Sequence, residues 1–300
     1  RRTNSIMIIG INGNIQKENI GKVIKEIISA LSENSLNYLL ASDLKNVLDY
    51  DSNQSTEKFL SLKNLSERSD IIISVGGDGT ILATAFEAQA FDKPVVGVNF
   101  GKLGFLAETD ISQVKELIKD IKNKNYSIEE RMLLKGICKE GSETIFAIND
   151  IVIDKGGWPK MIELKILVDD EYVTTFSADG VIVATPTGST GYSLSCAGPI
   201  VSPKADVMTI SPISPHSLSI RPLVLPNSAK ISIKANSHHT KVQINCDGQR
   251  VYFFTPPIEL TICKNDKPFK LIKTMNSSYF DILRNKLLWG LDVRNISKRN

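Results

Sequence analysis

The chain has 300 residues, 42% hydrophobic and 23% charged, which suits a globular protein with one large or two ordinary domains. The net charge of +3 is too small to indicate a nucleic-acid-binding or membrane-binding surface, and no apolar run approaches the roughly 18–20 residues that span a bilayer. The four cysteines form no CxxC pair, which argues against a zinc site or a disulfide framework and favours the reducing cytoplasm. No signal-peptide core follows Arg1, and the absence of an initial Met indicates a trimmed start.

The first third of the chain alternates apolar runs with segments of helical periodicity. Strands are predicted at residues 5–10, 38–41, 71–75 and 94–98, and helices at residues 18–33, 58–68, 81–88 and 111–122. Repeated strand–helix units of this length predict a parallel sheet with helices on its faces.

Short β-rich runs dominate from about Arg131. They lie at residues 133–138, 144–153, 162–168, 172–176, 180–184, 230–234, 241–245 and 259–263. Turn signals separate these runs, which predicts an antiparallel sandwich or barrel. A helical pattern returns from Tyr279 to Leu291. We therefore expect an α/β domain at residues 1–130, with residues 277–300 packing back on it, and a β-sandwich domain at residues 131–276.

The stretch Gly76-Gly77-Asp78-Gly79-Thr80 lies between a predicted strand and a predicted helix. Glycine has no Cβ, so phosphate oxygens approach its backbone N–H groups closely, and the start of a helix adds a favourable field for anions. A lone Asp repels phosphate, so its presence indicates metal chelation or proton abstraction from a hydroxyl. The alternative is a simple helix cap, and the flanking glycines favour phosphate-related function over it.

A second motif, Asp179 to Ser195, leads from a predicted core strand into a loop rich in glycine and small hydroxyl side chains. Such a loop offers many hydrogen-bonding groups and little bulk, which suits a polar ligand held against the backbone, and Tyr192 adds an aromatic face for a base. A surface loop rich in Ser and Thr is an equal alternative from these residues alone. A lipase-like nucleophile elbow is excluded, because Gly188-Ser189-Thr190-Gly191 lacks the Gly-x-Ser-x-Gly spacing.

Two adjacent polar residues, Asn149 and Asp150, interrupt an apolar run. Burying both without partners is costly, so they predict either a β-bulge or edge, or a pair that hydrogen-bonds ligand hydroxyls or an adenine edge. Asp247-Gly248-Gln249 is interpreted as a hairpin turn. Asn99 to Leu106 is either a ligand-binding edge of the parallel sheet or a plain connection. The basic run from Arg284 to Arg299 is typical of a solvated face.

Together these motifs resemble the NAD kinase family, whose members phosphorylate the 2′-hydroxyl of the adenosine ribose of NAD, with ATP, to make NADP. The resemblance rests on GGDGT, NFGKLGFL, the Asn-Asp pair, DGVIVATPTGSTGYSLS, SPISPHSLSIRPLV and DGQ, in the family's order from about residue 71 to 249. GGDGT alone is shared with lipid kinases such as diacylglycerol kinase, and TPTGSTGYSLS separates the two. Gly191 stands here where the family has Ala, a small-for-small change. Roughly the first 50 residues match no motif.

The resemblance implies an N-terminal Rossmann-like parallel α/β domain, a C-terminal β-sandwich domain and an active site between them. It implies that Asp78 is the general base, and that the ATP phosphates bind a loop formed by Gly76, Gly77, Gly79 and Thr80. The NAD-binding residues that it implies are Asp78, Gly79, Asn149, Asp150, Lys160, Ser177, Asp179, Thr187, Thr190, Gly191, Tyr192, Ser193, Leu194, Ser195 and Gln249. Asn149 and Asp150 match the pair that holds the nucleoside portion of NAD, and Asp179 is expected near the nicotinamide end.

The resemblance also implies ATP as phosphoryl donor, with Mg²⁺ or another divalent metal and no residue assigned as its direct ligand. The expected partners are NAD and ATP, without nucleic acid or membrane, in a cytoplasmic homo-oligomer that is a dimer or tetramer. A diacylglycerol-type lipid kinase and a non-catalytic NAD(H)-binding sensor are the alternatives. The hydroxyl-rich loop argues against the first, and the intact Asp78 turn argues against the second.

Overall fold

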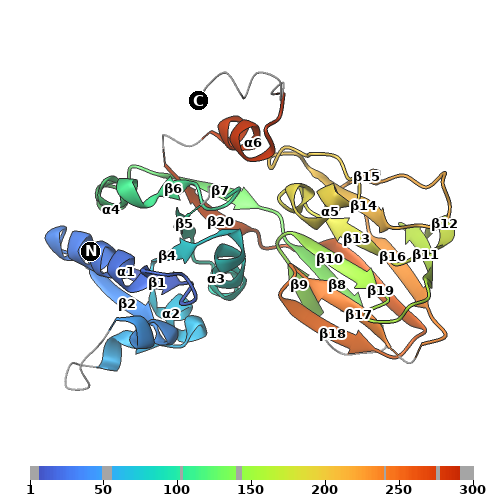
Figure 1. The fold of residues 1–300 in the computed structure, drawn as a ribbon, viewed down its shortest axis with the longest axis horizontal. Helices are drawn as coiled ribbons and strands as arrows, with labels where there is room; N and C mark the ends of the chain where they lie inside the picture. The colour runs from blue at the N-terminus through green and yellow to red at the C-terminus, as the bar shows by residue number, and fades with distance from the viewer. Residues whose placement is uncertain are drawn as a thin grey trace. The chain divides into compact units, whose positions relative to one another are not determined.

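A computed structural model describes most of the chain and divides it into two compact units (Figure 1). The described residues are 7–48, 56–101, 104–139, 144–239, 241–274 and 278–290. The first unit comprises residues 1–130 and 270–300, and the second comprises residues 131–269. The predictions for residues 5–6, for Lys102 and Leu103, and for the basic run beyond residue 290 lie outside the described residues.

The first unit is built on an eight-stranded sheet, counted over the described residues. Its strands are β1 (Ile8–Gly13), β2 (Asn37–Ala41), β3 (Phe59–Leu60), β4 (Ile71–Gly76), β5 (Val95–Asn99), β6 (Thr109–Asp110), β7 (Ser127–Arg131) and β20 (Phe269–Lys273). The order is β3-β2-β1-β4-β5-β20-β7, with β6 paired to β5. The pairs from β3 through β5 are all parallel, and this order is that of a Rossmann sheet.

Helices cover both faces of this sheet, as the sequence predicts (Figure 1). They are α1 (Ile20–Glu33), α2 (Leu62–Arg68), α3 (Asp78–Ala90) and α4 (Val114–Asn123). The unit also contains α6 (Tyr279–Leu287) and the short 3₁₀ turns η1 (Ser42–Val47), η2 (Thr56–Lys58) and η3 (Ile111–Gln113). In α1 the buried residues Ile20, Val23, Ile24, Ile27 and Leu31 recur at helical spacing and face the sheet. α1 packs beside α4, and α2 packs beside α3.

The second unit is a sandwich of two six-stranded sheets, and η4 (Gly188–Thr190) and α5 (Tyr192–Ser195) lie in the connection between β13 (Gly180–Ala184) and β14 (Val207–Ile213) of one of them. This sheet has the order β15 (Leu223–Pro226), β14, β13, β10 (Asp150–Asp154), β17 (Val242–Cys246) and β18 (Arg250–Phe254). The other has the order β12 (Glu171–Ala178), β11 (Ile162–Val168), β16 (Ile231–Asn236), β19 (Ile258–Lys264), β8 (Leu134–Cys138) and β9 (Thr144–Ala147). Every pairing within the two sheets is antiparallel, and a buried apolar cluster from both sheets fills the space between them.

Two boundaries differ from those that the sequence predicts. Residues 144–153 read as one β-run, but the structure has two strands in different sheets, because the chain crosses between sheets at Ile148-Asn149. The sandwich is predicted to extend to residue 276, but the second unit ends at Phe269. The reason is β20, which pairs parallel with β5 through Leu271 and Val95 and so returns the chain to the first sheet.

Candidate functional site

The carboxylate of Asp78 is held by a loop that follows β5. Asp78 opens α3 directly after β4, with Gly77 as the N-cap residue. One carboxylate oxygen accepts the backbone N–H groups of Leu106 (2.9 Å) and Ala107 (3.2 Å). The other accepts the N–H of Phe105 at 2.9 Å and the ammonium of Lys286 at 2.9 Å. The predicted segment from Asn99 to Leu106 is therefore more than a connection, because Phe105 and Leu106 at its end donate hydrogen bonds to the acidic residue of the glycine loop.

The surroundings of Asp78 favour its ionised form. Burial by itself raises the pKa of this carboxyl, but the N–H of Leu106, the charge of Lys286 and the N–H of Phe105 outweigh it, and the pKa lies below its ordinary value. Gly104 makes this approach possible. A Cβ on Gly104 would lie 2.1 Å from an Asp78 carboxylate oxygen, so a larger residue is incompatible with the contact.

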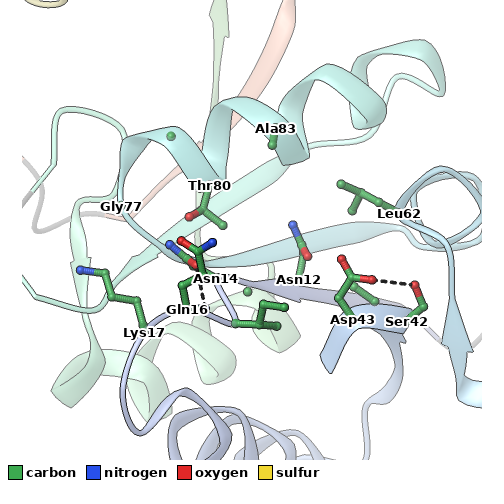
Figure 2. A pocket seen from close by; sticks show the side chains of 14 residues that line it. Asn12, Asn14, Gln16, Lys17, Ser42, Asp43, Leu62, Gly77, Thr80 and Ala83 are labelled. Atoms are coloured by element: carbon green, nitrogen blue, oxygen red, sulfur yellow. Dashed lines mark hydrogen bonds between the residues drawn. The ribbon is translucent and has the colours of Figure 1, made fainter. Parts of the chain in front are cut away.

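A polar pocket of about 540 Å³ lies against the glycine loop, wholly within the first unit (Figure 2). Gly77, Gly79 and Thr80 line it, and Gly76, the last residue of β4, does not. The opposite wall comes from the end of β1, the loop after it and the start of η1, and its polar members are Asn12, Asn14, Gln16, Lys17, Ser42 and Asp43. Figure 2 shows the Lys17 ammonium and the Asp43 carboxylate at separate ends of the pocket. The carboxyl ends of these parallel strands meet at one edge, where such sheets bind ligands.

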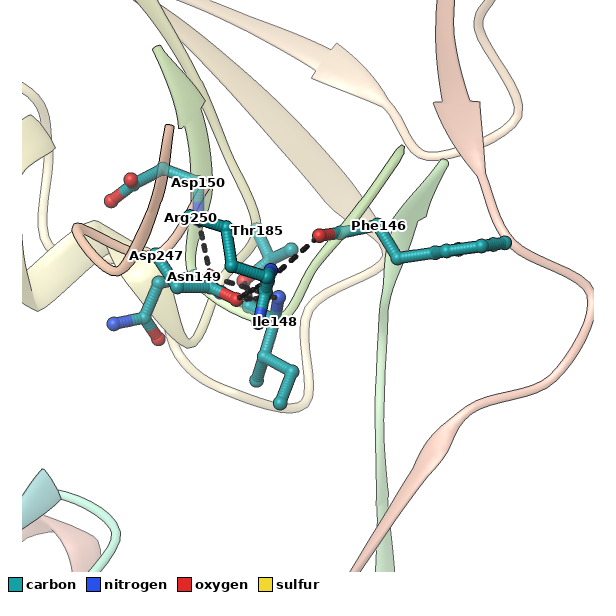
Figure 3. A network of polar contacts seen from close by, with 7 residues as sticks. All are labelled: Phe146, Ile148, Asn149, Asp150, Thr185, Asp247 and Arg250. Atoms are coloured by element: carbon teal, nitrogen blue, oxygen red, sulfur yellow. Dashed lines mark hydrogen bonds and ion pairs between the residues drawn. The ribbon is translucent and has the colours of Figure 1, made fainter. Parts of the chain in front are cut away.

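In the second unit, Asp247 organises the Asn149-Asp150 turn (Figure 3). Its buried carboxylate accepts the backbone N–H groups of Ile148 (2.9 Å), Asn149 (2.6 Å) and Asp150 (3.3 Å). Arg250 pairs with the second oxygen at 2.7 Å and also donates to the carbonyl of Phe146 at 2.9 Å. Asp247 thus does more than form the predicted hairpin turn.

The hydroxyl-rich loop packs directly on this turn. Thr185 accepts the N–H of Gly188 at 3.0 Å and donates its hydroxyl to the carbonyl of Ile148 at 2.6 Å. A Cβ on Gly188 would lie 2.1 Å from the carbonyl oxygen of Asn149, so glycine is needed for the two backbones to approach. Residues 185–189 of the loop are therefore buried in the second unit, so this part of it is not a plain surface loop.

A smaller pocket, of about 230 Å³, opens beside the turn within the second unit. It is lined by Asn149, Asp150, Val152, Asp154, Tyr192, Asn245, Asp247 and Gly248. Asp150 is buried at the start of β10, and burial together with the nearby charge of Asp247 raises its pKa to about 7. A carboxyl that changes its charge near neutral pH both accepts and donates hydrogen bonds, which suits it to ligand hydroxyls.

The other predicted NAD-binding residues of the second unit differ in how deeply they are buried. Thr187 is buried and accepts a hydrogen bond from Arg131 at 3.1 Å, and Ser193 is buried against the hydroxyl of Ser211 at 2.9 Å. Thr190, Gly191, Leu194 and Ser195 continue the same loop, partly or fully exposed. Lys160, Ser177 and Gln249 are exposed, and Asp179 pairs with Lys155 at 2.6 Å. These last four do not line the pocket of Asp150.

Several residues of both sites escaped the sequence analysis. Asp154 lies four residues after Asp150 and shares one face of β10 with it, and this even spacing along a strand was the signal that could have found it. The polar loop from Asn12 to Lys17 follows a predicted strand of a parallel sheet, which is itself a signal for a ligand site. Lys286 gave no local signal, because its partner Asp78 lies far away in the chain. Arg250 lies three residues after Asp247, and this i, i+3 spacing of opposite charges was a weak local signal for their pairing.

No metal cluster is present among the described residues, where no group of three or more His, Cys, Asp or Glu is arranged to hold an ion. In the same residues no helix is long and apolar enough to cross a membrane.

An α/β unit of Rossmann strand order with an acidic glycine loop, followed by a β-sandwich, defines a class of small-molecule kinases. Residues 9–126 match the ATP-NAD kinase N-terminal domain, and residues 148–274 match the ATP-NAD kinase C-terminal domain. The chain belongs to the ATP-NAD kinase family, which confirms the family and the fold class predicted from the sequence.

Curated relatives and solved structures agree with this membership. The chain is 42% identical to an NAD kinase of Clostridium botulinum (strain Kyoto / Type A2) over 284 residues, which are 93% of this chain and 95% of that protein. It is 38% identical to an NAD kinase of Prosthecochloris aestuarii over 281 residues, 92% of this chain and 95% of that one. A crystal structure of yeast NADH kinase complexed with NADH superposes with a TM-score of 0.85 at 27% identity, covering 97% of this chain and 90% of that one. An NAD kinase from Archaeoglobus fulgidus in complex with ATP gives 0.74 at 27%, covering 94% and 99%.

Proposed function

We propose that this protein is an NAD kinase that transfers the γ-phosphoryl group of ATP to the 2′-hydroxyl of the adenosine ribose of NAD. The observation that carries the proposal is the pairing of two features in one chain of this family. One is an ionised Asp at a glycine turn beside a polar pocket, and the other is a buried Asn-Asp turn packed against a hydroxyl-rich loop.

The phosphoryl donor is assigned to the pocket of the first unit. Gly77, Gly79 and Thr80 line the pocket at the start of α3, where the positive end of the helix dipole faces the phosphates. Lys17 on the facing wall adds a positive charge, as phosphoryl transfer requires. The 540 Å³ of the pocket lies in the usual range of small-molecule sites.

The nucleoside of NAD is assigned to the pocket of the second unit. Asn149 and Asp150 supply amide and carboxyl groups for base or ribose, and Tyr192, which is 48% exposed, supplies a ring face. The remaining predicted NAD contacts, namely Gly79, Lys160, Ser177, Asp179, Thr187, Thr190, Gly191, Ser193, Leu194, Ser195 and Gln249, stay proposals on the family resemblance.

In the reaction, Asp78 accepts the 2′-hydroxyl proton while the ribose oxygen forms a bond to the γ-phosphorus. The bond from that phosphorus to the β–γ bridging oxygen breaks, its electron pair leaves with ADP, and the proton passes from Asp78 to solvent. A positioned base contributes on the order of 10²–10⁴-fold to such a step. The pKa of Asp78 lies below its ordinary value, so the side chain is an ionised carboxylate at neutral pH.

Mg²⁺ or another divalent cation belongs to the proposal as a companion of ATP. The described residues offer no cage of three or more acidic, His or Cys ligands, and Mg²⁺ commonly binds substrate phosphates with one or two protein carboxylates. When bound, the cation neutralises phosphate charge. A cytoplasmic location and a homodimer or homotetramer complete the proposal, and light scattering on the purified protein measures the assembly.

The Asp78→Asn variant tests the proposal, because Asn keeps the size of the side chain and loses the base. With ATP, Mg²⁺ and NAD, the wild type is expected to form NADP, and Asp78→Asn is expected to lose about 10²–10⁴-fold in kcat while it still binds NAD by calorimetry. Asp92→Asn, a change just beyond the C-terminal end of α3, is the matched control. A wild type that binds NAD without turnover would indicate a sensor, and phosphorylation of diacylglycerol instead of NAD would indicate a lipid kinase.

A further inference from the structure

Two carboxylates in this protein, those of Asp78 and Asp247, are held by the same kind of hydrogen bonds, but their ion pairs differ in burial. Asp78 accepts three successive backbone N–H groups, at residues 105–107, and Asp247 accepts three others, at residues 148–150. Each also pairs with one basic side chain, Lys286 for Asp78 and Arg250 for Asp247.

The two ion pairs differ in their access to solvent. The side chains of Asp247 and Arg250 are 0% and 18% exposed, and Arg250 is fixed by a second bond to a backbone carbonyl. Those of Asp78 and Lys286 are 26% and 35% exposed. Lys286 lies in the last turn of α6 on a long flexible stem, with its ammonium 4.7 Å from the centre of the Phe105 ring. The Asp78 pair can therefore open without unfolding the loop.

The proposed base has no spare acceptor position in this arrangement. A carboxylate offers about four lone-pair sites, and Asp78 receives four donors, three from the backbone and one from Lys286. A general base must lie within hydrogen-bond reach of the proton that it takes. One donor must leave, and the lysine is the one that a side-chain rotation removes.

We propose that Lys286 is a positioning residue for the phosphoryl transfer: it orients the Asp78 carboxylate in the free enzyme, and yields its place at that oxygen to the acceptor hydroxyl. The inference rests on the proposed function of Asp78. After the exchange the lysine stays on the ring of Phe105, beside the carboxylate. Helix α6 therefore belongs to the active site, although it carries none of the sequence motifs.

The charges around Asp78 make Lys286 the group to change. From α6 it is the charge that acts on this carboxyl, and the loop at 105–107 contributes backbone N–H groups. Glu108, next on that loop, pairs with Lys273 of β20. Lys17 faces Gly101 and the donor pocket.

The test compares Lys286→Met with Lys286→Arg and Arg284→Met. Arg284 lies on the same helix and pairs with Asp281 of that helix, so it is the matched control for loss of a positive charge. For Lys286→Met we expect kcat to fall about 10–100-fold through misplacement of the base, with the KM values for NAD and ATP within about twofold of wild type by the same reasoning. The acid limb of the pH–rate profile moves to higher pH. Lys286→Arg restores most of the activity, and Arg284→Met behaves as wild type.

A second readout does not depend on turnover. Carbon-13 NMR titration of the aspartate carboxyls, with the Asp78 signal identified by its absence in Asp78→Asn, measures the pKa of Asp78 directly. We expect that pKa to rise in Lys286→Met and to stay unchanged in Arg284→Met. An unshifted pKa and an unshifted acid limb in folded Lys286→Met would overturn the inference. If the wild type has no NAD kinase activity, but the pKa of Asp78 still rises in Lys286→Met, the proposed function is wrong and the coupling of Lys286 to Asp78 stands.

Discussion

Asp247 shows how one buried side chain shapes a ligand-binding turn. Three consecutive backbone N–H groups, which no strand partner satisfies where the chain crosses between sheets, all point to its carboxylate. Buried backbone donors need such partners. Arg250 balances the charge, and the turn at Asn149 is fixed in one conformation before any ligand arrives.

Removal of this carboxylate is expected to cost stability and NAD affinity together. Asp247→Ala leaves three backbone N–H groups without their acceptor and removes the carboxylate that balances the charge of Arg250, and loss of one partner of a buried ion pair costs about 3–5 kcal/mol. Urea unfolding measures the loss, and calorimetry measures NAD binding. Asp266→Ala, an exposed change in the same unit, is the control and is expected to stay within about 0.5 kcal/mol of wild type. Wild-type stability in Asp247→Ala would contradict the assigned role.

Asp150 is expected to lower the stability of the folded protein above about pH 4 while it contributes to NAD binding. Its pKa is about 7 in the folded protein against 3.8 for an ordinary Asp. Between these values the folded state holds the extra proton, so the free energy of unfolding falls as pH rises from about 4 to about 7, and stays low above that. Asp150→Asn carries no charge and escapes this loss. We therefore expect the melting temperature of Asp150→Asn to exceed that of the wild type by more at pH 8 than at pH 5, with weaker NAD binding. Asp266→Asn controls for the change in net charge, and an equal difference at both pH values would refute the prediction.

At the scale of elements, the sequence predicts those that local pattern determines. The helical spacing in α1 and the buried run of β4 are both local signals, and both predicted elements are present. The split between β9 and β10 was hidden, because the apolar residues on either side of Asn149 read as one run. No strand was predicted at the residues of β20, which fell inside the predicted bounds of the sandwich, residues 131–276. Its partner β5 lies far away in the chain, and short strands carry no signal for the sheet they join.

In the candidate site, too, local motifs could be predicted from the sequence and contacts between distant residues could not. GGDGT and the hydroxyl-rich loop are contiguous in sequence, so their place at a strand-to-helix turn and after a core strand was predictable. The partners of Asp78 come from β5's following loop and from α6, and the partners of Asp247 come from a strand crossing about 100 residues earlier. Such contacts follow from topology, which the local pattern does not contain.

Gly104 allows the loop after β5 to approach the Asp78 carboxylate, because glycine has no Cβ at this point. In Gly104→Ala the new Cβ would lie 2.1 Å from the Asp78 carboxylate oxygen, so the loop and the acid must separate. We expect kcat to fall about 10²-fold, the scale of a 1 Å misplacement, with NAD affinity unchanged. Steady-state kinetics and calorimetry measure the two. Gly157→Ala is the control, because a Cβ there meets no atom within 4 Å. Wild-type kcat in Gly104→Ala would show that the loop grip on Asp78 does not matter for turnover.

At the scale of the whole molecule, the two substrates are assigned to different units, and each assignment has its own exchange signature. A ligand that binds only the folded state at about 100 times its Kd stabilises it by about 2.7 kcal/mol, and amide hydrogen exchange locates that protection. ATP alone is expected to slow exchange in the 12–17 loop and at Gly77–Thr80, where the larger pocket lies. NAD alone is expected to slow exchange at Ile148–Asp150 and at Gly188–Ser195, around the smaller pocket. In Lys17→Met the ATP signature weakens and the NAD signature persists, because the change touches only the first pocket. Protection of the 12–17 loop by NAD, or of the 188–195 loop by ATP, would reverse the assignment of donor and acceptor to the two units.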